Sequence, residues 1–362
     1  MKKKVLHVIN SMVPGGAEIL LTNSLAPGGL CEHTENYLAF FMAPSYLTDQ
    51  LDKKVHVHFL DYKGGTHIIR LLRQLRTIIK ENKIDIVHSH LNPASTYVHI
   101  ACPRHIPHVH TIHTTYSMDK ETTKFKLWTE KNLYLKSRKS NLIFLSEFTK
   151  ADFLQHLPFM GNAFVLNNFV DDAFFELQRK TQPQPLKRLK LIAIGSLRPV
   201  KNFEYLLEVF RYLKDLPISL DIYGRGNTEY YEKLIRENGL SITMKGHSSN
   251  LQETLTSYDL FIMPSKFEGF PLSVFEAMAT GVPLMLSDIA PLSSIVKDNA
   301  IYFKLGDAEK AAEQIMAVLE NKIDINTMAV KAKKYAEKTV RREIYINNLL
   351  KIYKEVLHTC MD

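Results

Sequence analysis

Cysteine is scarce in this sequence, and the few cysteines form no pattern. There are only 3, without the spacing of a zinc site or of a disulfide framework. No run of residues approaches the ~18 apolar positions that a membrane-spanning helix needs. These absences fit a protein of the reducing cytosol without a membrane span, and we expect a cytoplasmic location.

The first residues imitate a signal peptide without matching one. Three lysines precede an apolar stretch that is short, contains His7 and runs into Pro14 and two glycines rather than into a cleavage site. We therefore expect residues 4–9 to form a buried strand.

The composition is that of a globular protein with an excess of positive charge. The chain of 362 residues is long enough for two domains with their own cores, and its 45% of hydrophobic residues excludes wholesale disorder. The formal net charge of +8 favours anionic partners such as nucleotide phosphates, lipid pyrophosphates or an acidic membrane surface. We find no nucleic-acid recognition motif, so nucleic acid is not an expected partner.

Strand-like runs alternate with helix-like segments through the whole chain, which predicts an α/β fold with parallel sheets. The first series of strands is expected near residues 4–9, 37–41, 55–60, 84–88, 109–112, 142–145 and 164–166, and the second near 189–194, 218–223, 242–244, 260–263, 283–286 and 300–303. A polar, proline-bearing segment, Gln178–Arg188, separates the two series. We expect an N-terminal domain over residues 1–180, a linker over 181–188, a second domain over 189–338 and a final helix over 339–362.

The most informative stretch is Asp259–Ser287, DLFIMPSKFEGFPLSVFEAMATGVPLMLS. Its apolar ends predict buried parallel strands, and Leu272–Ala279 between them predicts a helix with Pro271 in its first turn. Gly281 follows where a left-handed helix cap is expected. In such a βαβ unit a ligand binds at the carboxyl end of the strand and the amino end of the helix.

Two glutamates mark this ligand position. Glu268 lies in the loop before the helix, and Glu276 lies inside the helix, roughly 7–8 Å of rise from its start. They are too far apart to share one proton, but they can hold two ends of an elongated ligand whose anionic middle lies over the helix N-terminus. A nucleotide-sugar has this layout. An isolated pair of this kind would more often be a loop carboxylate and a helix salt-bridge partner.

The pattern P-S-x-x-E-G-F-P-x-x-x-x-E-A-M-A-x-G-x-P around these glutamates resembles the signature of glycosyltransferase family 4, whose members are retaining enzymes of the GT-B fold. The resemblance implies two Rossmann-like domains facing a central cleft, with a C-terminal helix, here 341–357, that crosses back to the N-terminal domain. It implies that Glu268 binds the sugar hydroxyls and Glu276 the ribose hydroxyls. The remaining donor contacts of this stretch would be Gly269, Phe270, Pro271, Leu272 and Ser273.

The resemblance also points to cations for the donor diphosphate. Lys201 matches the family's lysine at that position, and Ser196 stands where an arginine is usual. Arg198, two residues on, could reach the same phosphate from a shifted position. We expect Lys201 and Arg198 to be catalytic and Ser196 to border the donor.

Glycine-bearing loops complete the expected donor site. Gly15 and Gly16 follow the first strand, and Gly224 and Gly226 form a G-x-G turn after another strand. Such glycines let the backbone approach a ligand closely, although a plain strand–helix turn would contain them too. In the family these loops face the donor, and Lys245 lies in the turn that borders the base.

Histidines gather at the ends of two expected strands. His88 and His90 share one face of a strand, and His108, His110 and His113 follow on the next. They could form a metal cluster or simply line a cleft; no carboxylate or cysteine completes a recognisable ligand set, so we expect no metal site. The resemblance assigns a role to His113 alone, as the histidine that the N-terminal domain offers to the donor sugar.

Other segments are less specific. The segment Lys120–Lys139 mixes aromatic and basic residues, so it could lie on an acidic membrane or pack on its own domain, and we favour packing. Ser146-Glu147 and Asn168-Phe169-Val170-Asp171 resemble structural markers of the family, with Phe169 where glycine is usual. Ser287-Asp288 resembles a further family motif without an assigned role.

The resemblance implies a retaining, hexosyltransferase-like enzyme. It would move a sugar from a nucleoside diphosphate, UDP first, to a hydroxyl of a glycan or lipid-linked acceptor in bacterial capsule or lipopolysaccharide synthesis. We expect front-side attack, no cofactor and no metal requirement, since no convincing D-x-D motif is present, and peripheral contact with the inner membrane stays open. The alternatives are a GT-B epimerase or phosphorylase, and an inactive nucleotide-sugar-binding subunit.

Overall fold

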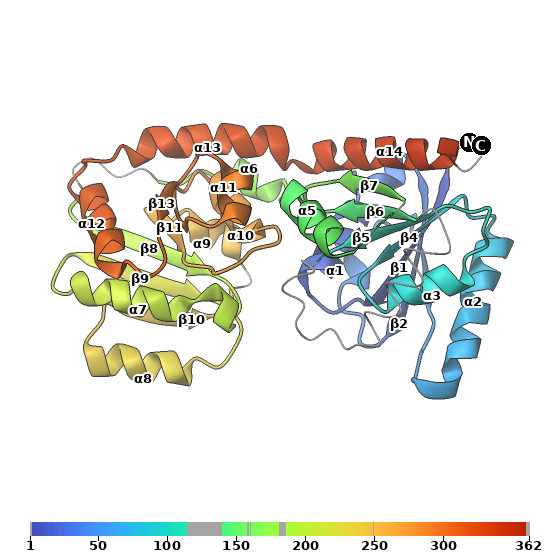
Figure 1. The fold of residues 1–362 in the computed structure, drawn as a ribbon, viewed down its shortest axis with the longest axis horizontal. Helices are drawn as coiled ribbons and strands as arrows, with labels where there is room; N and C mark the ends of the chain where they lie inside the picture. The colour runs from blue at the N-terminus through green and yellow to red at the C-terminus, as the bar shows by residue number, and fades with distance from the viewer. Residues whose placement is uncertain are drawn as a thin grey trace. The chain divides into compact units, whose positions relative to one another are not determined.

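Two compact units divide the chain. The computed structural model describes residues 2–113, 140–157, 159, 161–180, 186–248 and 250–359. Unit 1 consists of Met1–Phe169 and Arg342–Asp362, and unit 2 consists of Val170–Arg341 (Figure 1). The segment Lys120–Lys139 lies outside the described residues. Within the described ranges no helix has both the length and the apolar character to cross a membrane.

Unit 1 is built on a parallel sheet with the order β3-β2-β1-β4-β5-β6-β7, as far as the described residues show. Its strands are apolar runs, which is typical of a sheet covered on both faces. They are β1 (Lys4–Ser11), β2 (Glu35–Met42), β3 (His56–Phe59), β4 (Ile86–His90), β5 (His108–Ile112), β6 (Asn141–Phe144) and β7 (Asn162–Val165).

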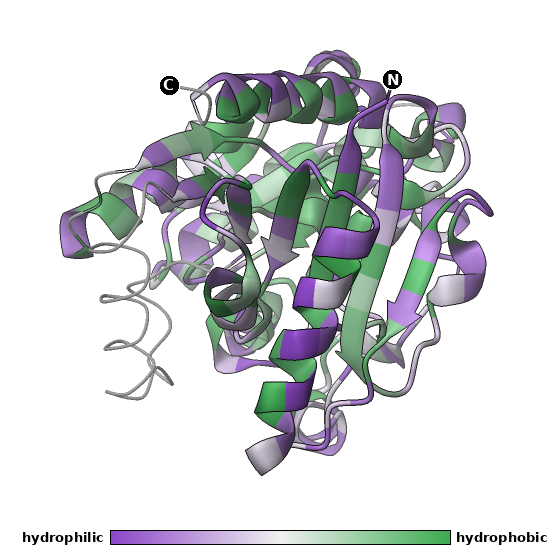
Figure 2. Ribbon diagram, turned by 90° about the vertical axis from the view of Figure 1, so that its right-hand side faces the viewer, coloured by the Kyte–Doolittle hydropathy of each residue, from purple (hydrophilic) through white to green (hydrophobic). Residues whose placement is uncertain are grey.

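Helices cover both faces of this sheet. On one face of the sheet α2 packs Leu71, Leu75 and Ile78 against the strands, and its other side is mostly polar, as the two-coloured helix in front in Figure 2 shows. On the other face Tyr345 and Tyr353 of α14 lie in the apolar cluster of β1 and β2. The helices of unit 1 are α1 (Gly16–Leu25), α2 (Ile68–Glu81), α3 (Ala94–Ala101), α5 (Glu147–His156) and α14 (Arg342–Thr359).

The last helix therefore returns to the N-terminal unit, as the sequence predicts. The ring of Phe169, at the position where glycine is usual in the family motif, lies 4.9 Å from the ring of Tyr345 on α14. Ser146 forms a capping box with Thr149 at the start of α5. One residue of each family marker, Ser146 and Phe169, thus makes a structural contact in unit 1.

Unit 2 repeats the same architecture with a parallel sheet of order β10-β9-β8-β11-β12-β13. The strands are β8 (Leu189–Ile194), β9 (Ile218–Tyr223), β10 (Ile242–Gly246), β11 (Leu260–Met263), β12 (Leu284–Ser287) and β13 (Ile301–Phe303). The helices are α6 (Ala173–Glu176), α7 (Phe203–Tyr212), α8 (Glu229–Asn238), α9 (Leu251–Leu255), α10 (Leu272–Ala279), α11 (Ala290–Val296), α12 (Ala308–Leu319) and α13 (Ile325–Thr339). Gly281 has φ +75, which confirms the left-handed cap expected after α10.

Candidate active site

The carboxyl ends of the central strands of unit 2 are joined by hydrogen bonds between their loops. After β8 the chain makes a short 3-10 helix, Pro199–Lys201. The backbone N–H of Lys266, in the loop after β11, donates to the Val200 carbonyl at 2.8 Å, and the N–H of Leu197 donates to Arg225 after β9 at 2.9 Å. These bonds fix the predicted phosphate-binding loop beside the loop that carries Glu268.

Lys201 and Glu268 form the centre of this site. The Lys201 Nζ lies 2.7 Å from Glu268 Oε1, and the side chains are 15% and 8% exposed. The Ser265 hydroxyl donates to the same carboxylate oxygen at 2.6 Å. In turn, the Ser287 hydroxyl donates to the Ser265 carbonyl at 2.6 Å. The sequence predicts Lys201 and Glu268 as ligands of one donor, and the structure brings them into contact.

Close backbone packing explains the glycines of this site. A Cβ atom on Gly224 would lie 1.8 Å from the Gly195 carbonyl oxygen, so no side chain fits there. Gly195 in turn leaves room for the methylene chain of Lys201, because a Cβ atom at position 195 would lie 3.2 Å from the Lys201 Cδ. The tight contact of the two loops therefore guides Lys201 toward Glu268.

Arg198 lies on the exposed rim of the same loop. Its Nε donates to the Ser196 hydroxyl at 3.0 Å. The residue that occupies the usual arginine position and the arginine two places on are thus in direct contact. Arg198 has no ion-pair partner among the described residues, so its charge stays available to an anion.

Glu276 lies inside α10. Burial, reinforced by the nearby charge of Asp171, raises the pKa of its carboxyl to about 7. Asp171 belongs to the predicted N-x-V-D marker, and its Oδ1 accepts from the backbone N–H of Ala173. This marker therefore acts electrostatically on a predicted donor-binding residue, which sequence reasoning did not anticipate.

The start of α10 is an ordered turn. The Phe270 ring stacks on the Phe275 ring at 5.0 Å. The N–H of Leu272 donates to the Phe270 carbonyl at 3.1 Å, and that of Val274 to the Pro271 carbonyl at 3.1 Å. Pro271 itself has no N–H. Phosphate binding by Leu272 would therefore require this turn to open.

Lys245 forms an ion pair with Asp221 of β9 and not with the residues around Glu268. Its Nζ lies 3.7 Å from Asp221 Oδ2. The Tyr258 hydroxyl donates to the same oxygen at 2.6 Å, and Tyr223, directly before Gly224, lies 3.2 Å from Tyr258 between hydroxyls. The predicted base-bordering residue is thus held by a polar network on β9 and β10.

Three predicted site residues belong to unit 1. Gly15 and Gly16 form the start of α1, and a Cβ on Gly15 would lie 2.5 Å from Glu18 Oε2. His113 follows β5, and its Nε2 is buried without a partner among the described residues. Burial, reinforced by His110, lowers the pKa of His113 to about 3, so this imidazole is neutral at physiological pH.

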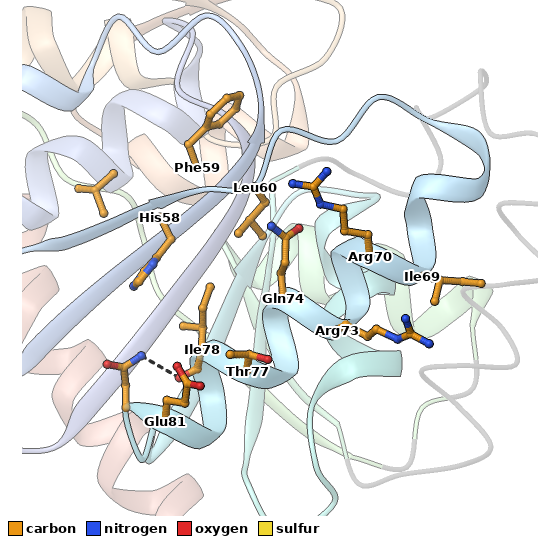
Figure 3. Close-up of a pocket in the computed structure, with 12 residues that line it drawn as sticks. His58, Phe59, Leu60, Ile69, Arg70, Arg73, Gln74, Thr77, Ile78 and Glu81 are labelled. Carbon is orange, nitrogen blue, oxygen red and sulfur yellow. Dashed lines mark hydrogen bonds between the residues drawn. The ribbon is translucent and has the colours of Figure 1, made fainter.

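A pocket of about 780 Å³ lies elsewhere in unit 1, between the edge strand β3 and α2 (Figure 3). Arg70 and Arg73, from consecutive turns of α2, line it together with His58 and Gln74. None of the residues predicted to bind the donor lines this pocket. It is therefore a separate surface of unit 1.

Sequence reasoning missed residues that hold Lys201 and Glu268 in place. Ser265 and Ser287 support Glu268, and Asn202 adopts a left-handed conformation, φ +56, with its side-chain amide donating to the Pro264 carbonyl at 3.2 Å. Ser265 was visible as part of the P-S-x-x-E pattern, because a hydroxyl so close in sequence can reach the glutamate. Nothing in the sequence placed Ser287 or Asn202 against this loop.

Comparison with known proteins identifies the family. The model described as Glycosyltransferase Family 4 matches residues 32–174, and the model described as Glycosyl transferases group 1 matches residues 174–339. The chain belongs to the family 4 glycosyltransferases. Its family and enzyme class, both predicted from the sequence, are thereby confirmed.

Relatives of this glycosyltransferase act in the assembly of bacterial glycans according to their names. The UDP-Gal:alpha-D-GlcNAc-diphosphoundecaprenol alpha-1,3-galactosyltransferase of Escherichia coli is 25% identical over 315 residues, which cover 78% of this chain and 79% of the relative. The capsular polysaccharide biosynthesis glycosyltransferase CapH of Staphylococcus aureus is 23% identical over 318 residues, covering 83% and 87%.

Solved structures show that the glycosyltransferase has the predicted GT-B fold. A glycosyltransferase from Rickettsia africae ESF-5 superposes with a TM-score of 0.82 at 18% identity and 98% and 99% coverage. HepE from Anabaena in complex with UDP and glucose superposes with a TM-score of 0.79 at 18% identity and 98% and 100% coverage. At these identities the likeness establishes the fold alone.

Proposed function

We propose that this glycosyltransferase transfers a sugar from a UDP-sugar, with retention of anomeric configuration, to a glycan or lipid-linked acceptor in bacterial surface polysaccharide synthesis. The observation that carries the proposal is the buried contact of Lys201 with Glu268 at the carboxyl end of the sheet in unit 2. It is supported by the galactosyltransferase relative whose name includes UDP-Gal and by the structural neighbour in complex with UDP and glucose.

Lys201 is proposed to bind the donor diphosphate. Its ammonium has three N–H groups, and the contact with Glu268 uses only part of them. As the bond to the sugar breaks, negative charge grows on the leaving diphosphate, and a fixed cation lowers the energy of that state. Arg198, on the rim of the same loop, would add a second cation.

Glu268 is proposed to bind the hydroxyls of the donor sugar. Its Oε1 already accepts from Lys201 and from Ser265, which holds the carboxylate in one orientation. Its Oε2 would then accept from the sugar. Such fixed acceptors orient the anomeric carbon for attack.

Glu276 and His113 are proposed to complete donor recognition. A deprotonated Glu276 can accept a hydrogen bond from a ribose hydroxyl at each of its two oxygens, and such bonds to a charged carboxylate are stronger than bonds to a neutral carboxyl. The neutral imidazole of His113 can exchange a hydrogen bond with the sugar without adding charge. The proposed attack is front-side, with the leaving phosphate accepting the proton of the acceptor hydroxyl.

The acceptor is proposed to lie at an anionic membrane surface, with the enzyme on its cytoplasmic face. Arg70 and Arg73 of the α2 pocket are exposed, and the apolar side chains of Ile69 and Phe59 beside them are 57% and 47% exposed. Basic and apolar groups together bind the phosphates and the acyl boundary of such a surface. The diphosphoundecaprenol in the name of the E. coli relative supports an acceptor of this kind.

Calorimetric titration with UDP and with GDP, in EDTA, tests the donor. UDP binding without metal, weakened in Lys201→Ala, is the expected result. Binding of GDP alone would be consistent with a glycosyltransferase that uses a GDP-sugar in place of a UDP-sugar. Binding of neither would refute the proposed donor site, whereas binding without any turnover of donor would favour an inactive nucleotide-sugar-binding subunit, the alternative to which Ser196 at the usual arginine position points.

A further inference from the structure

Three histidines from two neighbouring strands converge in the interior of unit 1. Strands β1 and β4 pair in a register that sets His7 beside His88, and His90 follows two positions along β4. The exposed fractions of His7, His88 and His90 are 1%, 0% and 2%. One ligand nitrogen from each of them lies within 4.8 Å of the other two. The sequence shows only the pair on β4, because the third histidine, on β1, is far from them along the chain.

Several ring nitrogens in this cluster have no partner among the described residues. His90 has none at either nitrogen, and His7 has none at Nδ1. Buried polar atoms of this kind are costly and rare, and an ordered water or an ion commonly accounts for them. Their concentration in one place indicates that a bound group completes them.

The neighbours of His7 determine which of its nitrogens is free to bind. The Asn36 amide nitrogen donates to the Thr34 carbonyl at 3.1 Å, so the Asn36 Oδ1 is directed to His7 Nε2, at 3.4 Å. Because Oδ1 only accepts, His7 Nε2 carries the proton. The buried Nδ1 is therefore the unprotonated nitrogen, and its lone pair has no partner among the described residues.

His88 is held from both sides by hydroxyl groups. One ring nitrogen lies 2.7 Å from the Tyr353 hydroxyl of α14 and the other lies 2.8 Å from the Thr111 hydroxyl. An ion bound at one nitrogen would displace the hydroxyl there, and the other nitrogen would keep its hydrogen-bond partner. Metal-binding histidines commonly have such an outer contact, which fixes the tautomer and the ring orientation.

Burial keeps the cluster uncharged. It lowers the pKa of His7 to about 4. Burial and the neighbouring histidines together lower the pKa values of His88 and His90 well below their usual range. At physiological pH each ring is therefore in the neutral form that binds metal ions.

We propose that His7, His88 and His90 form a binding site for a transition-metal dication, Zn²⁺ in the first place, that ties β1 to β4. Three imidazoles suit Zn²⁺, Co²⁺ or Ni²⁺, whereas Mg²⁺ and Ca²⁺ require oxygen ligands. A tetrahedral Zn²⁺ with bonds of about 2.0–2.1 Å needs its ligand nitrogens about 3.4 Å apart, so the rings rotate inward on binding. A water molecule takes the fourth position.

The role of this site is structural. It contains none of the residues proposed to bind the donor, and the proposal does not depend on the donor or on transfer activity. Because the ion would bind the folded unit and not the unfolded chain, it would raise thermal stability according to its concentration.

Titration of the untagged, chelator-treated full-length protein with Zn²⁺ tests the site. We expect one ion per chain, a rise of about 5–10 °C in the melting temperature of unit 1 at a hundred-fold excess over Kd, and a visible d–d spectrum of tetrahedral type with Co²⁺. His90→Phe keeps an aromatic ring but removes the ligand. It should abolish the spectrum and the Zn²⁺-dependent rise, and His7→Phe should do the same.

His58→Phe is the matched control, because His58 lies on β3 in the same unit outside the cluster, and it should keep the whole response. Since His90 has no hydrogen bond to lose, the metal-free melting temperature of His90→Phe should not fall. A Zn²⁺ response of equal size in wild type and His90→Phe would overturn the proposal, as would no response in wild type.

Discussion

Lys201 and Glu268, separated by 67 positions in the sequence, are in contact at 2.7 Å at the carboxyl edge of the sheet in unit 2. Both side chains are nearly buried, so the charge of each is stabilised mainly by the other. Removing one partner of such a pair leaves an unpaired buried charge and typically costs about 3–5 kcal/mol. This contact is therefore important both for stability and for the proposed transfer.

Lys201→Ala should reduce kcat/KM for a UDP-sugar by about 10²–10³-fold, because it removes a fixed cation from the leaving diphosphate. Initial rates and UDP titrations measure the effect. The control is Lys266→Ala, which changes an exposed lysine of the facing loop and keeps its backbone bond to Val200. Equal activity of Lys201→Ala and wild type would refute the phosphate role.

Because Lys201→Ala also leaves Glu268 unpaired, loss of folding must be separated from loss of catalysis. The double variant Lys201→Met with Glu268→Gln removes both charges and should recover the melting temperature without recovering activity. Recovery of both would mean that the pair is structural only.

Ser265→Ala should lower kcat/KM about 10–100-fold, since a hydrogen bond to a charged group contributes about 1.5–3 kcal/mol. The hydroxyl of Ser265 donates to Glu268 at 2.6 Å and fixes the carboxylate that we assign to the donor sugar. The loss should appear with UDP-sugar and be nearly absent in binding of UDP, which lacks the sugar. Ser257→Ala, at an exposed position, is the control; an equal loss of UDP affinity in Ser265→Ala would contradict the assignment.

The strand and helix pattern could be predicted from the sequence because its signals are specific. Apolar runs indicate buried strands, Pro271 indicates the start of a helix, and Gly281 indicates a helix end. The sequence predicted Glu268 from an ordered pattern and Lys201 from a separate match to the family's lysine at that position. It could not predict the bond from Ser287 to the Ser265 carbonyl or the role of Asp171 near Glu276, since both depend on how distant loops pack. For the same reason the sequence could not predict that His7 lies beside His88 and His90. Only the register of β1 against β4 sets His7 next to His88.

Arg70→Gln with Arg73→Gln should weaken binding to vesicles rich in phosphatidylglycerol by about 10–30-fold at low salt, because each basic residue near an anionic surface contributes about 1 kcal/mol. Co-sedimentation with vesicles measures it. Binding to neutral phosphatidylcholine vesicles should be weak throughout. Arg211→Gln with Arg236→Gln, a matched change on helices of unit 2, should have little effect; if it had the larger one, the membrane surface would not be the α2 pocket.

The pKa of Glu276, raised by burial to about 7, predicts opposite effects of pH on donor binding and on stability. The proposed contact with the ribose is stronger with the carboxylate than with the neutral carboxyl, so UDP affinity should rise as the pH increases from 6 to 8. Stability should change the other way. The folded-state pKa lies above the usual 4.5, so the protonated form favours folding, and this contribution is lost as the pH rises from about 4.5 through 7.

Glu276→Gln separates the two effects, because it keeps the shape of the side chain and cannot ionise. It should remove the rise in UDP affinity between pH 6 and 8. Over the same interval the melting temperature of Glu276→Gln should increase relative to that of wild type. Calorimetric titration and thermal unfolding at matched pH values measure these changes. If wild type and Glu276→Gln had parallel pH profiles in both measurements, Glu276 would neither bind the ribose as a carboxylate nor titrate near neutrality.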